Sequence, residues 1–259
     1  MSTTAPRPHV DRSLLIDGLG KGLRVMECFS DERARLTATE AGELAGLTRT
    51  AARRYLVSLV HFGYAQTDGK HYWLGPRVLR LGQGYLESAR LPRLVQPFLQ
   101  QLSAKTGETA NLSVLDGHEV VYLVRSNSPR VVSIGFHVGA RVPAHTVSPG
   151  CVLLSDLAEP ELEAWIAAHD FGRFTPHTIT DAAAFRAAVD VARRQGHSSV
   201  DQNLNVGLRG VAVPLADRKG RHRGAISITF PAQVYPGESY LTRLLPPLRE
   251  AAQAMRDVV

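Results

Sequence analysis

The sequence has little cysteine, with only Cys28 and Cys151 in 259 residues. The two stand far apart, and no metal-ligand spacing surrounds either of them, which excludes a disulfide-stapled scaffold. Free thiols suit a reducing compartment, so we expect a cytoplasmic protein. The ten histidines show no spacing that assembles a metal site, and no cofactor motif is present. We therefore expect neither a metal nor a cofactor.

Long apolar runs are also missing. No stretch approaches the ~20 apolar residues that a membrane-spanning helix needs, so we expect no membrane partner. The first residues, MSTTAPRPHVDRS, lack an apolar segment and fit neither a signal peptide nor an anchor. We expect residues 1–14 to form a short mobile arm.

Charge of one sign is concentrated in a small part of the chain. The net charge is +6, and residues 48–80 hold six basic side chains and one acidic side chain, or 6 − 1 = +5. Such a concentrated excess is expected for a protein that binds a polyanion. A basic helix face that is merely solvated remains the alternative. The basic residues are Arg49, Arg53, Arg54, Lys70, Arg77 and Arg80.

Helical patterns surround this basic stretch. Apolar spacing predicts a first helix over 17–29 and a short second helix with Thr39 as its N-cap, Ala41, Leu44 and Ala45 facing inward, and Gly46 ending it. Thr48 is expected to cap a third helix. Its buried stripe would contain Ala51, Ala52, Tyr55, Leu56, Leu59 and Val60. This order predicts a helix-turn-helix, whose second helix enters the DNA major groove.

A hairpin follows the third helix, because Asp68-Gly69 joins two short β-rich runs and places Lys70 at the tip. Residues 15–75 therefore predict a winged helix-turn-helix that binds double-stranded promoter DNA. The helix would contact bases and the hairpin would contact phosphates. The predicted DNA-binding residues are Thr39, Thr48, Arg49, Thr50, Arg53, Arg54 and Lys70.

A linker helix is predicted over 76–90, with Pro92 beyond its end. Its apolar side chains Leu79, Tyr85 and Leu86 are expected to hold part of a dimer interface. Beyond it, residues 91–259 alternate helical patterns with β-rich runs, including a strand over 130–136. Helices flanking a mostly antiparallel sheet predict an α+β domain large enough to enclose a ligand.

These segments together resemble the IclR family of bacterial transcription regulators over nearly the whole chain. The similar stretches include LTRTAARRYLVSLVHFGYAQTDGKHYWLGPRVLRLG, VGARVPAHTVSPGCVLLS and DQNLNVGLRGVAVPL. The first resembles the branch that controls protocatechuate and 4-hydroxybenzoate breakdown. The resemblance implies a C-terminal effector domain like a GAF fold, and homodimers or homotetramers on partly palindromic promoters. It leaves activation and repression open.

An effector site is predicted where Ser148 and Pro149 open a helix. Unpaired N–H groups at a helix start favour an anion, so a carboxylate could bind the amides of Ser148 to Cys151. Alternatively, Ser148 merely caps a core helix. The resemblance implies that a small organic acid contacts Ser148, Pro149, Asp201, Gly210 and Ser227. We expect a hydroxylated aromatic acid. Its apolar walls would be Val131, Ile134 and Val142, with Gly150 and Cys151 at the helix start.

Two departures from the family pattern bear on the effector. Cys151 stands where a Lys or Arg is common, and Asn203 stands where a Glu is common. Asp201 has an alternative interpretation as a turn-forming carboxylate.

Two other functions compete with regulation. Cys151 near His145 suggests a thiol nucleophile, although no catalytic motif supports an enzyme. A helix-turn-helix that serves only for dimerisation is the second alternative, and the basic cluster argues against it.

Overall fold

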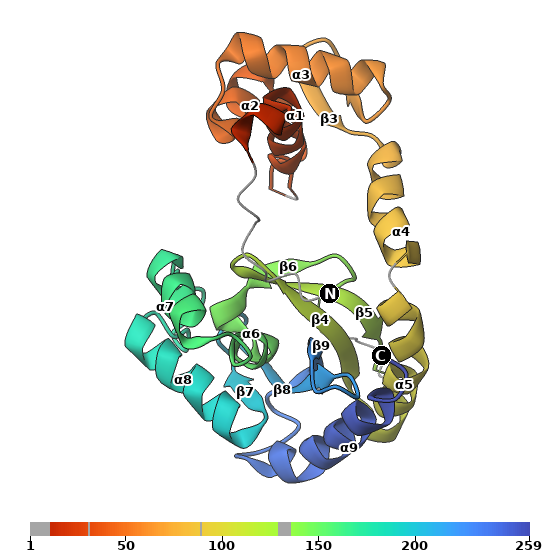
Figure 1. Ribbon diagram of the computed structural model, residues 1–259, viewed down its shortest axis with the longest axis vertical. Coiled ribbons are helices and arrows are strands. Elements are labelled where there is room, and N and C mark those ends of the chain that lie inside the picture. Colours follow the sequence, from red (N-terminus) through yellow and green to blue (C-terminus); the bar gives the residue numbers. More distant parts are fainter. Residues whose placement is uncertain (1–10, 31, 89, 129–135) are drawn as a thin grey trace. The chain divides into compact units, whose positions relative to one another are not determined.

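The computed structural model describes residues 11–30, 32–88, 90–128 and 136–259, which form two units (Figure 1). The N-terminal unit ends at Ser88. Residues 1–10 of the predicted arm lie outside the described residues, and Arg12–Leu14 form a short 3-10 helix, η1. No helix in the described residues is long and apolar enough to cross a membrane.

The N-terminal unit is a winged helix-turn-helix. Its helices are α1 (Asp17–Glu27), α2 (Ala38–Ala45) and α3 (Arg49–His61). Its three strands are β1 (Leu36–Thr37), β2 (Ala65–Thr67) and β3 (His71–Leu74), and they form an antiparallel sheet in the order β1-β3-β2. Val25, Ala41, Leu56 and Tyr72 meet in one apolar core. The predicted three helices and hairpin are confirmed.

The turn between α2 and α3 explains the helix-turn-helix geometry. Gly46 ends α2 in the left-handed conformation, with φ of 65°, which glycine adopts without a steric penalty. Thr48 then caps α3 by accepting a hydrogen bond from the Ala51 N–H at 3.2 Å, as predicted.

Two predictions about α2 are wrong. The cap is Thr37, whose hydroxyl accepts from the Glu40 N–H while Glu40 accepts from the Thr37 N–H, so Thr39 lies inside the helix. Leu44 does not face inward, because 45% of its surface is exposed.

The predicted linker is a 3-10 turn, η2 (Pro76–Val78), followed by α4 (Leu79–Ser88). Leu79 and Tyr85 are both exposed. A new helix, α5 (Arg90–Thr106), begins at once, so Pro92 lies near its start and does not mark the end of the linker. The side chain of Leu86 lies outside what the structure describes.

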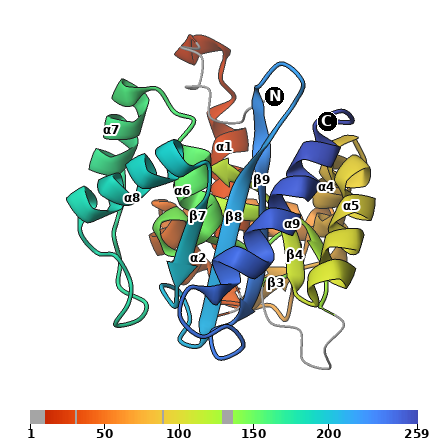
Figure 2. The same ribbon diagram turned by 90° about the horizontal axis from the view of Figure 1, so that it is seen from below.

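The C-terminal unit is built on a six-stranded antiparallel sheet in the order β6-β5-β4-β9-β8-β7. Figure 1 labels its six strands, and Figure 2 shows β7, β8, β9 and β4 side by side. Helices α5 and α9 (Ser239–Met255) pack on one face, against Val211, Val213 and Ile226. Helix α6 (Ser148–Leu154) packs on the other face, where Val152 meets Ala212 and Ala225. The strands are β4 (Thr109–Asp116), β5 (Glu119–Ser126), β6 (Arg141–Pro143), β7 (Ser198–Asp201), β8 (Leu208–Ala216) and β9 (His222–Pro231).

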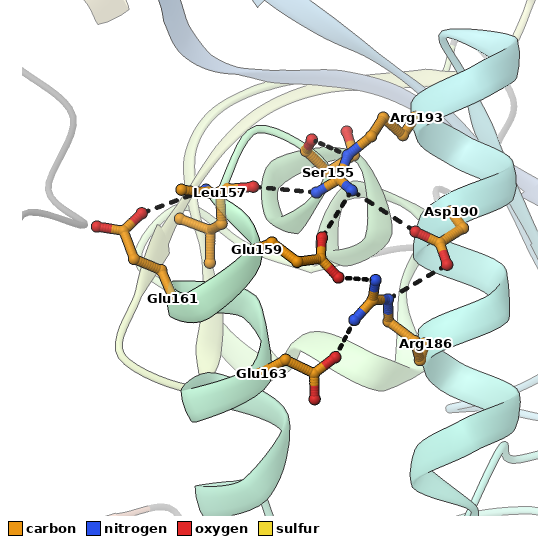
Figure 3. Close-up of polar contacts among 9 residues, drawn as sticks. Ser155, Leu157, Glu159, Glu161, Glu163, Arg186, Asp190 and Arg193 are labelled. Atoms are coloured by element: carbon orange, nitrogen blue, oxygen red, sulfur yellow. Dashed lines mark hydrogen bonds and ion pairs between the residues drawn. The ribbon is translucent and has the colours of Figure 1, made fainter.

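Two further helices, α7 (Glu159–Ala168) and α8 (Ala182–Gln195), lie on the α6 side. The predicted α+β fold is confirmed. The predicted strand over 130–136 lies almost entirely outside the described residues. Arg186 and Arg193 of α8 join α7 through ion pairs with Glu159, as Figure 3 shows.

Candidate nucleic-acid interface and ligand cavity

Helix α3 presents one apolar and one basic side. Ala52 and Leu56 are fully buried in the core of the N-terminal unit, while Arg49, Arg53 and Arg54 are exposed. Thr50 is exposed on the same helix. Among the described residues, none of these three arginines forms an ion pair, so their guanidinium groups are available to an external anion.

The wing hairpin is held in shape by Asp68. Its Oδ1 accepts hydrogen bonds from the Lys70 N–H at 2.9 Å and the His71 N–H at 2.7 Å. These backbone hydrogen bonds, from His71 first, lower the pKa of Asp68 to about 2. Lys70 is exposed at the tip. A basic helix beside a fixed basic hairpin fits a DNA groove and its phosphates.

A cavity lies in the C-terminal unit between the start of α6, the sheet and the loop after β7. Its volume is small, about 20 Å³. Ser148, Pro149 and Gly210, which the resemblance assigns to the effector site, line it. Their contact with an effector stays a prediction. Thr229 and Tyr122 supply hydroxyl groups, and the remaining wall is formed by Phe136, Thr146, Val147, Val200, Asn203, Leu204, Asn205, Leu208 and Arg209.

Ser148 lines the cavity but does not cap α6. The N-cap of α6 is Val147, and Ser148 is the first helical residue, so the predicted capping role is wrong. A Cβ on Gly210 would lie 3.0 Å from the Ser148 hydroxyl oxygen. Glycine at this position therefore keeps the cavity open. Gly150 is packed against the backbone of Ala144 and is buried.

Two buried polar atoms on the α6 side of the sheet lack hydrogen bonds: Asn111 Oδ1 and Ser227 Oγ. Asn111 and Ser227 are direct partners across β4 and β9, and the Asn111 amide donates to the hydroxyl of Thr229, a cavity-lining residue, at 3.3 Å. Such unpaired buried groups are rare in folded proteins and point to a missing partner. The family resemblance assigns Ser227 to the effector site, but Ser227 is not among the residues that line the cavity, so this assignment stays a prediction. No signal in the sequence pointed to Asn111.

Asp201 is not among the residues that line the cavity. It forms a two-pronged ion pair with Arg209, at 2.6 and 2.7 Å, which lowers the pKa of Asp201. The Arg209 guanidinium also donates to the carbonyls of Tyr235 and Gly237, beside α9. The role of Asp201 in ligand binding therefore stays a prediction.

The other predicted positions divide into two groups. Val142 is buried in the core under α6 and does not line the cavity, and Cys151 is likewise buried. Burial raises the pKa of the Cys151 thiol to about 11, so the thiolate needed by a nucleophile is absent at neutral pH. Val131 and Ile134 lie outside the described residues.

Three histidines, His118, His145 and His169, form a chain of contacts in the C-terminal unit. His145 Nε2 contacts the Gly172 carbonyl at 3.0 Å, and a carbonyl only accepts, so this nitrogen carries the proton. Neutral His145 then accepts from His169 Nε2 at 2.7 Å, and His169 accepts from His118 at 3.1 Å. Both nitrogens of His145 are occupied, so it orders its loop and cannot activate Cys151.

The histidine chain predicts a pH-dependent stability. Burial, followed by the neighbouring His145 and His118, lowers the pKa of His169 to about 4, and burial lowers that of His145. Below an ordinary histidine pKa of about 6.5 the unfolded chain binds more protons than the folded chain. Stability should thus be complete above pH 6.5 and fall from there toward pH 4.

Thermal unfolding between pH 7.5 and 4.5 tests this, with His169→Phe as the comparison. The variant keeps a ring on Trp165, which His169 stacks on, but removes one titrating group. Its unfolding temperature should decline less steeply with acid than that of the wild type. Equal declines of the two unfolding temperatures would show that His169 does not cause the loss of stability in acid. The charge of Asp170 raises the pKa of His169 and of His145. The wild type and His169→Phe both retain Asp170, so it does not affect the comparison.

Comparisons with known proteins agree with both units. The pattern described as Bacterial transcriptional regulator IclR C-terminal matches residues 83–256, and the IclR helix-turn-helix domain matches residues 18–69. The p-hydroxybenzoate hydroxylase transcriptional activator of Acinetobacter baylyi is 39% identical over 249 residues, covering 94% of this chain and 92% of that protein.

Two solved structures are also similar. One is an IclR homolog from Microbacterium hydrocarbonoxydans complexed with 4-hydroxybenzoate, with 28% identity, a TM-score of 0.72 and coverage of 92% and 97% of the two chains. The other is a double mutant of the PobR inducer-binding domain from Acinetobacter with 3-hydroxybenzoic acid. It has 35% identity and a TM-score of 0.62, and covers 66% of this chain and all of that chain.

The two matched patterns coincide with the winged helix-turn-helix and with the α+β domain that holds the cavity, which together are the parts of a DNA-binding transcription regulator. The chain belongs to the IclR family of bacterial transcription regulators. It is a regulator and not an enzyme.

Proposed function

We propose that this regulator binds promoter DNA through α3 and the wing, and controls genes of aromatic acid catabolism in response to a small hydroxylated aromatic acid. The relatives that bind 4-hydroxybenzoate and 3-hydroxybenzoic acid support this effector class. The cavity at the start of α6 is the proposed effector site. Promoter binding places the protein in the cytoplasm.

The unpaired atoms beside the cavity carry the proposal. An unsatisfied buried polar group costs about 1–3 kcal/mol, which a ligand that supplies the missing hydrogen bond recovers. Asn111 Oδ1 can only accept, so it fits the hydrogen of a phenolic hydroxyl. Ser227 Oγ can donate or accept. Apolar walls with a few polar atoms fit an aromatic ring better than a sugar.

The carboxylate of the effector is assigned to the start of α6. Pro149 has no N–H and the Gly150 N–H donates to the Val147 carbonyl at 3.0 Å. The Ser148 hydroxyl is therefore the proposed donor, and the helix start favours negative charge. Cys151 leaves this end without the cation that relatives commonly carry. Arg209 lines the cavity, but its guanidinium is held by Asp201. We therefore expect micromolar affinity.

The effector also has to open its site. A cavity of about 20 Å³ holds roughly one water molecule, far less than a benzoate ring. The wall that includes Asn203 and Asn205 lies in the loop after β7. The hydroxyls of Thr175 and Thr178 bond the carbonyls of Gln202 and Asn203, which fastens this loop. Because the cavity is too small for the ring, we expect binding to displace residues 202–207 and to break these hydrogen bonds.

Calorimetry with 4-hydroxybenzoate and benzoate tests the assignment. Asn111→Leu removes the acceptor at similar size, so it should weaken 4-hydroxybenzoate about tenfold, or 1.4 kcal/mol, and change benzoate little. Asp201→Ala tests the sequence-based prediction that Asp201 contacts the ligand hydroxyl. If the variant binds 4-hydroxybenzoate more weakly but binds benzoate as the wild type does, the Asp201 carboxylate belongs to the ligand site. Failure of both acids to bind the wild type would contradict the effector class.

We further propose that the protein acts as a homodimer or homotetramer. One winged helix covers a half-site, and a dimer places two recognition helices about one DNA turn or a multiple apart. Leu79 and Tyr85 on α4, and Leu19 and Leu23 on α1, are large exposed apolar side chains that a partner chain could cover. Sedimentation should give at least a dimer mass, and Leu79→Glu/Tyr85→Glu should lower it. A monomer that occupies the operator alone would contradict the proposal.

A further inference from the structure

A second basic hairpin lies in the C-terminal unit, at the turn between β8 and β9. Residues 217–223 hold Arg218, Lys219, Arg221 and Arg223 against Asp217, a net 4 − 1 = +3. The chain total is +6 and residues 48–80 hold +5, so the remaining chain carries 6 − 5 − 3 = −2. The basic excess therefore has two centres, whereas the sequence-based prediction placed nearly all of it in residues 48–80.

One buried carboxylate organises this turn. Asp217 Oδ1 accepts from the Lys219 N–H at 2.9 Å and the Arg221 N–H at 3.0 Å. Asp217 Oδ2 accepts from Arg221 Nε at 2.8 Å and from Arg223 Nε at 3.1 Å. Asp217 itself is only 3% exposed. The turn and two guanidinium groups are thus fixed before any partner arrives.

The ionised state of Asp217 is secure. Burial favours the neutral acid, but hydrogen bonds from Arg221 and Lys219 outweigh it and hold the pKa at about 2. The carboxylate therefore stays charged at neutral pH, and the geometry of the turn persists. The same device shapes the wing, where Asp68 Oδ1 accepts the N–H groups of Lys70 and His71.

The cations of the turn remain accessible. Arg218 and Arg221 are 73% and 60% exposed, and Arg218 reaches only the equally open Asp257, a surface pair that stabilises little. Within the described residues, the Lys219 ammonium forms no ion pair. The turn extends beyond the end of α9 in Figure 2. Four cationic side chains in one turn repel each other, and a single carboxylate offsets only part of this repulsion. An anionic partner would offset the rest.

We propose that the β8–β9 hairpin is a second DNA contact, which binds phosphates flanking the operator. Clustered arginine and lysine side chains on a fixed hairpin match the spaced charges of a duplex backbone. The C-terminal unit is covalently joined to the DNA-binding unit, so operator binding raises the effective concentration of this hairpin around the same duplex. Even a weak contact between the hairpin and phosphates then contributes measurably to the DNA affinity.

Fluorescence anisotropy of the full-length protein tests the proposal at several salt concentrations. One duplex is the operator, selected from random sequences by the wild type and trimmed to about two helical turns. The other carries the same operator with about two further turns on each side. Arg218→Gln/Lys219→Gln removes two accessible cations and leaves Asp217, Arg221 and Arg223 in place. The matched control, Arg194→Gln/Arg243→Gln, removes two exposed cations elsewhere in the C-terminal unit.

On the long duplex the hairpin variant should bind about tenfold more weakly at low salt. Its salt slope should fall by about 1–2, since each phosphate contact contributes roughly 0.9. On the trimmed operator it should match the control, which separates this contact from the operator contacts of α3. Equal binding of variant and control to the long duplex would overturn the proposal. Unchanged DNA binding with lost transcriptional control would assign the hairpin to an acidic protein instead, and also overturn it.

Discussion

Replacing Arg49, Arg53 and Arg54 of α3 together with Ala should weaken operator binding at least 100-fold. An arginine that reads a base contributes about 1–3 kcal/mol, and 1.4 kcal/mol is tenfold in affinity. Two contacts of about 1.4 kcal/mol each, or three of about 1 kcal/mol each, therefore reach this loss. All three side chains are exposed. Alanine also favours helix formation, so α3 should persist and circular dichroism should remain unchanged.

Two comparisons make this result specific. Arg24→Ala/Arg33→Ala removes exposed cations from the same unit away from α3, and it should bind the operator nearly as the wild type does. Lys70→Ala should weaken all sequences about equally and reduce the salt slope by about one. Operator affinity retained by the folded triple variant would remove α3 from the DNA interface.

Filling the cavity at Gly210 should abolish effector binding. A Cβ there would already lie 3.0 Å from the Ser148 hydroxyl, so the side chain of Gly210→Val would occupy the space proposed for the ligand. We expect at least a 100-fold loss of 4-hydroxybenzoate affinity, and an intermediate loss for Gly210→Ala. Overpacking costs about 1–3 kcal/mol of stability, so thermal unfolding should accompany the calorimetry.

The DNA-binding unit offers an internal control for this change. Gly210 lies in the C-terminal unit, so Gly210→Val should bind the operator without effector as the wild type does. Wild-type affinity for 4-hydroxybenzoate in a folded Gly210→Val protein would move the effector site elsewhere.

Local signals explain why the N-terminal unit could be predicted from the sequence. Apolar spacing, Gly46 and Asp68-Gly69 each act over a few residues, and the helices and the hairpin followed from them. The cap of α2 had an equally local signal, because Thr37 and Glu40 have the capping-box spacing. This pair, and not Thr39, marks the start of α2. Leu44 is exposed although apolar, which spacing alone does not reveal.

Much of the ligand site depends on contacts between distant segments. Asn111 and Ser227 meet only through the pairing of β4 with β9. Asp201 faces Arg209 because β7 and β8 align at that position, and this pairing engages the carboxylate expected for the ligand. The histidine chain joins residues 118, 145 and 169, which no spacing rule connects. Strand register and loop packing decide these contacts.

We propose that an aromatic acid bound in the α6 cavity changes the affinity of α3 for DNA. The decisive measurement is a titration of 4-hydroxybenzoate into the operator complexes of the wild type and Gly210→Val, followed by fluorescence anisotropy. Allosteric coupling is typically about 1–3 kcal/mol, so operator affinity of the wild type should change roughly 5- to 150-fold, while Gly210→Val should not respond. A wild-type operator affinity that is the same with and without saturating 4-hydroxybenzoate would contradict the claim.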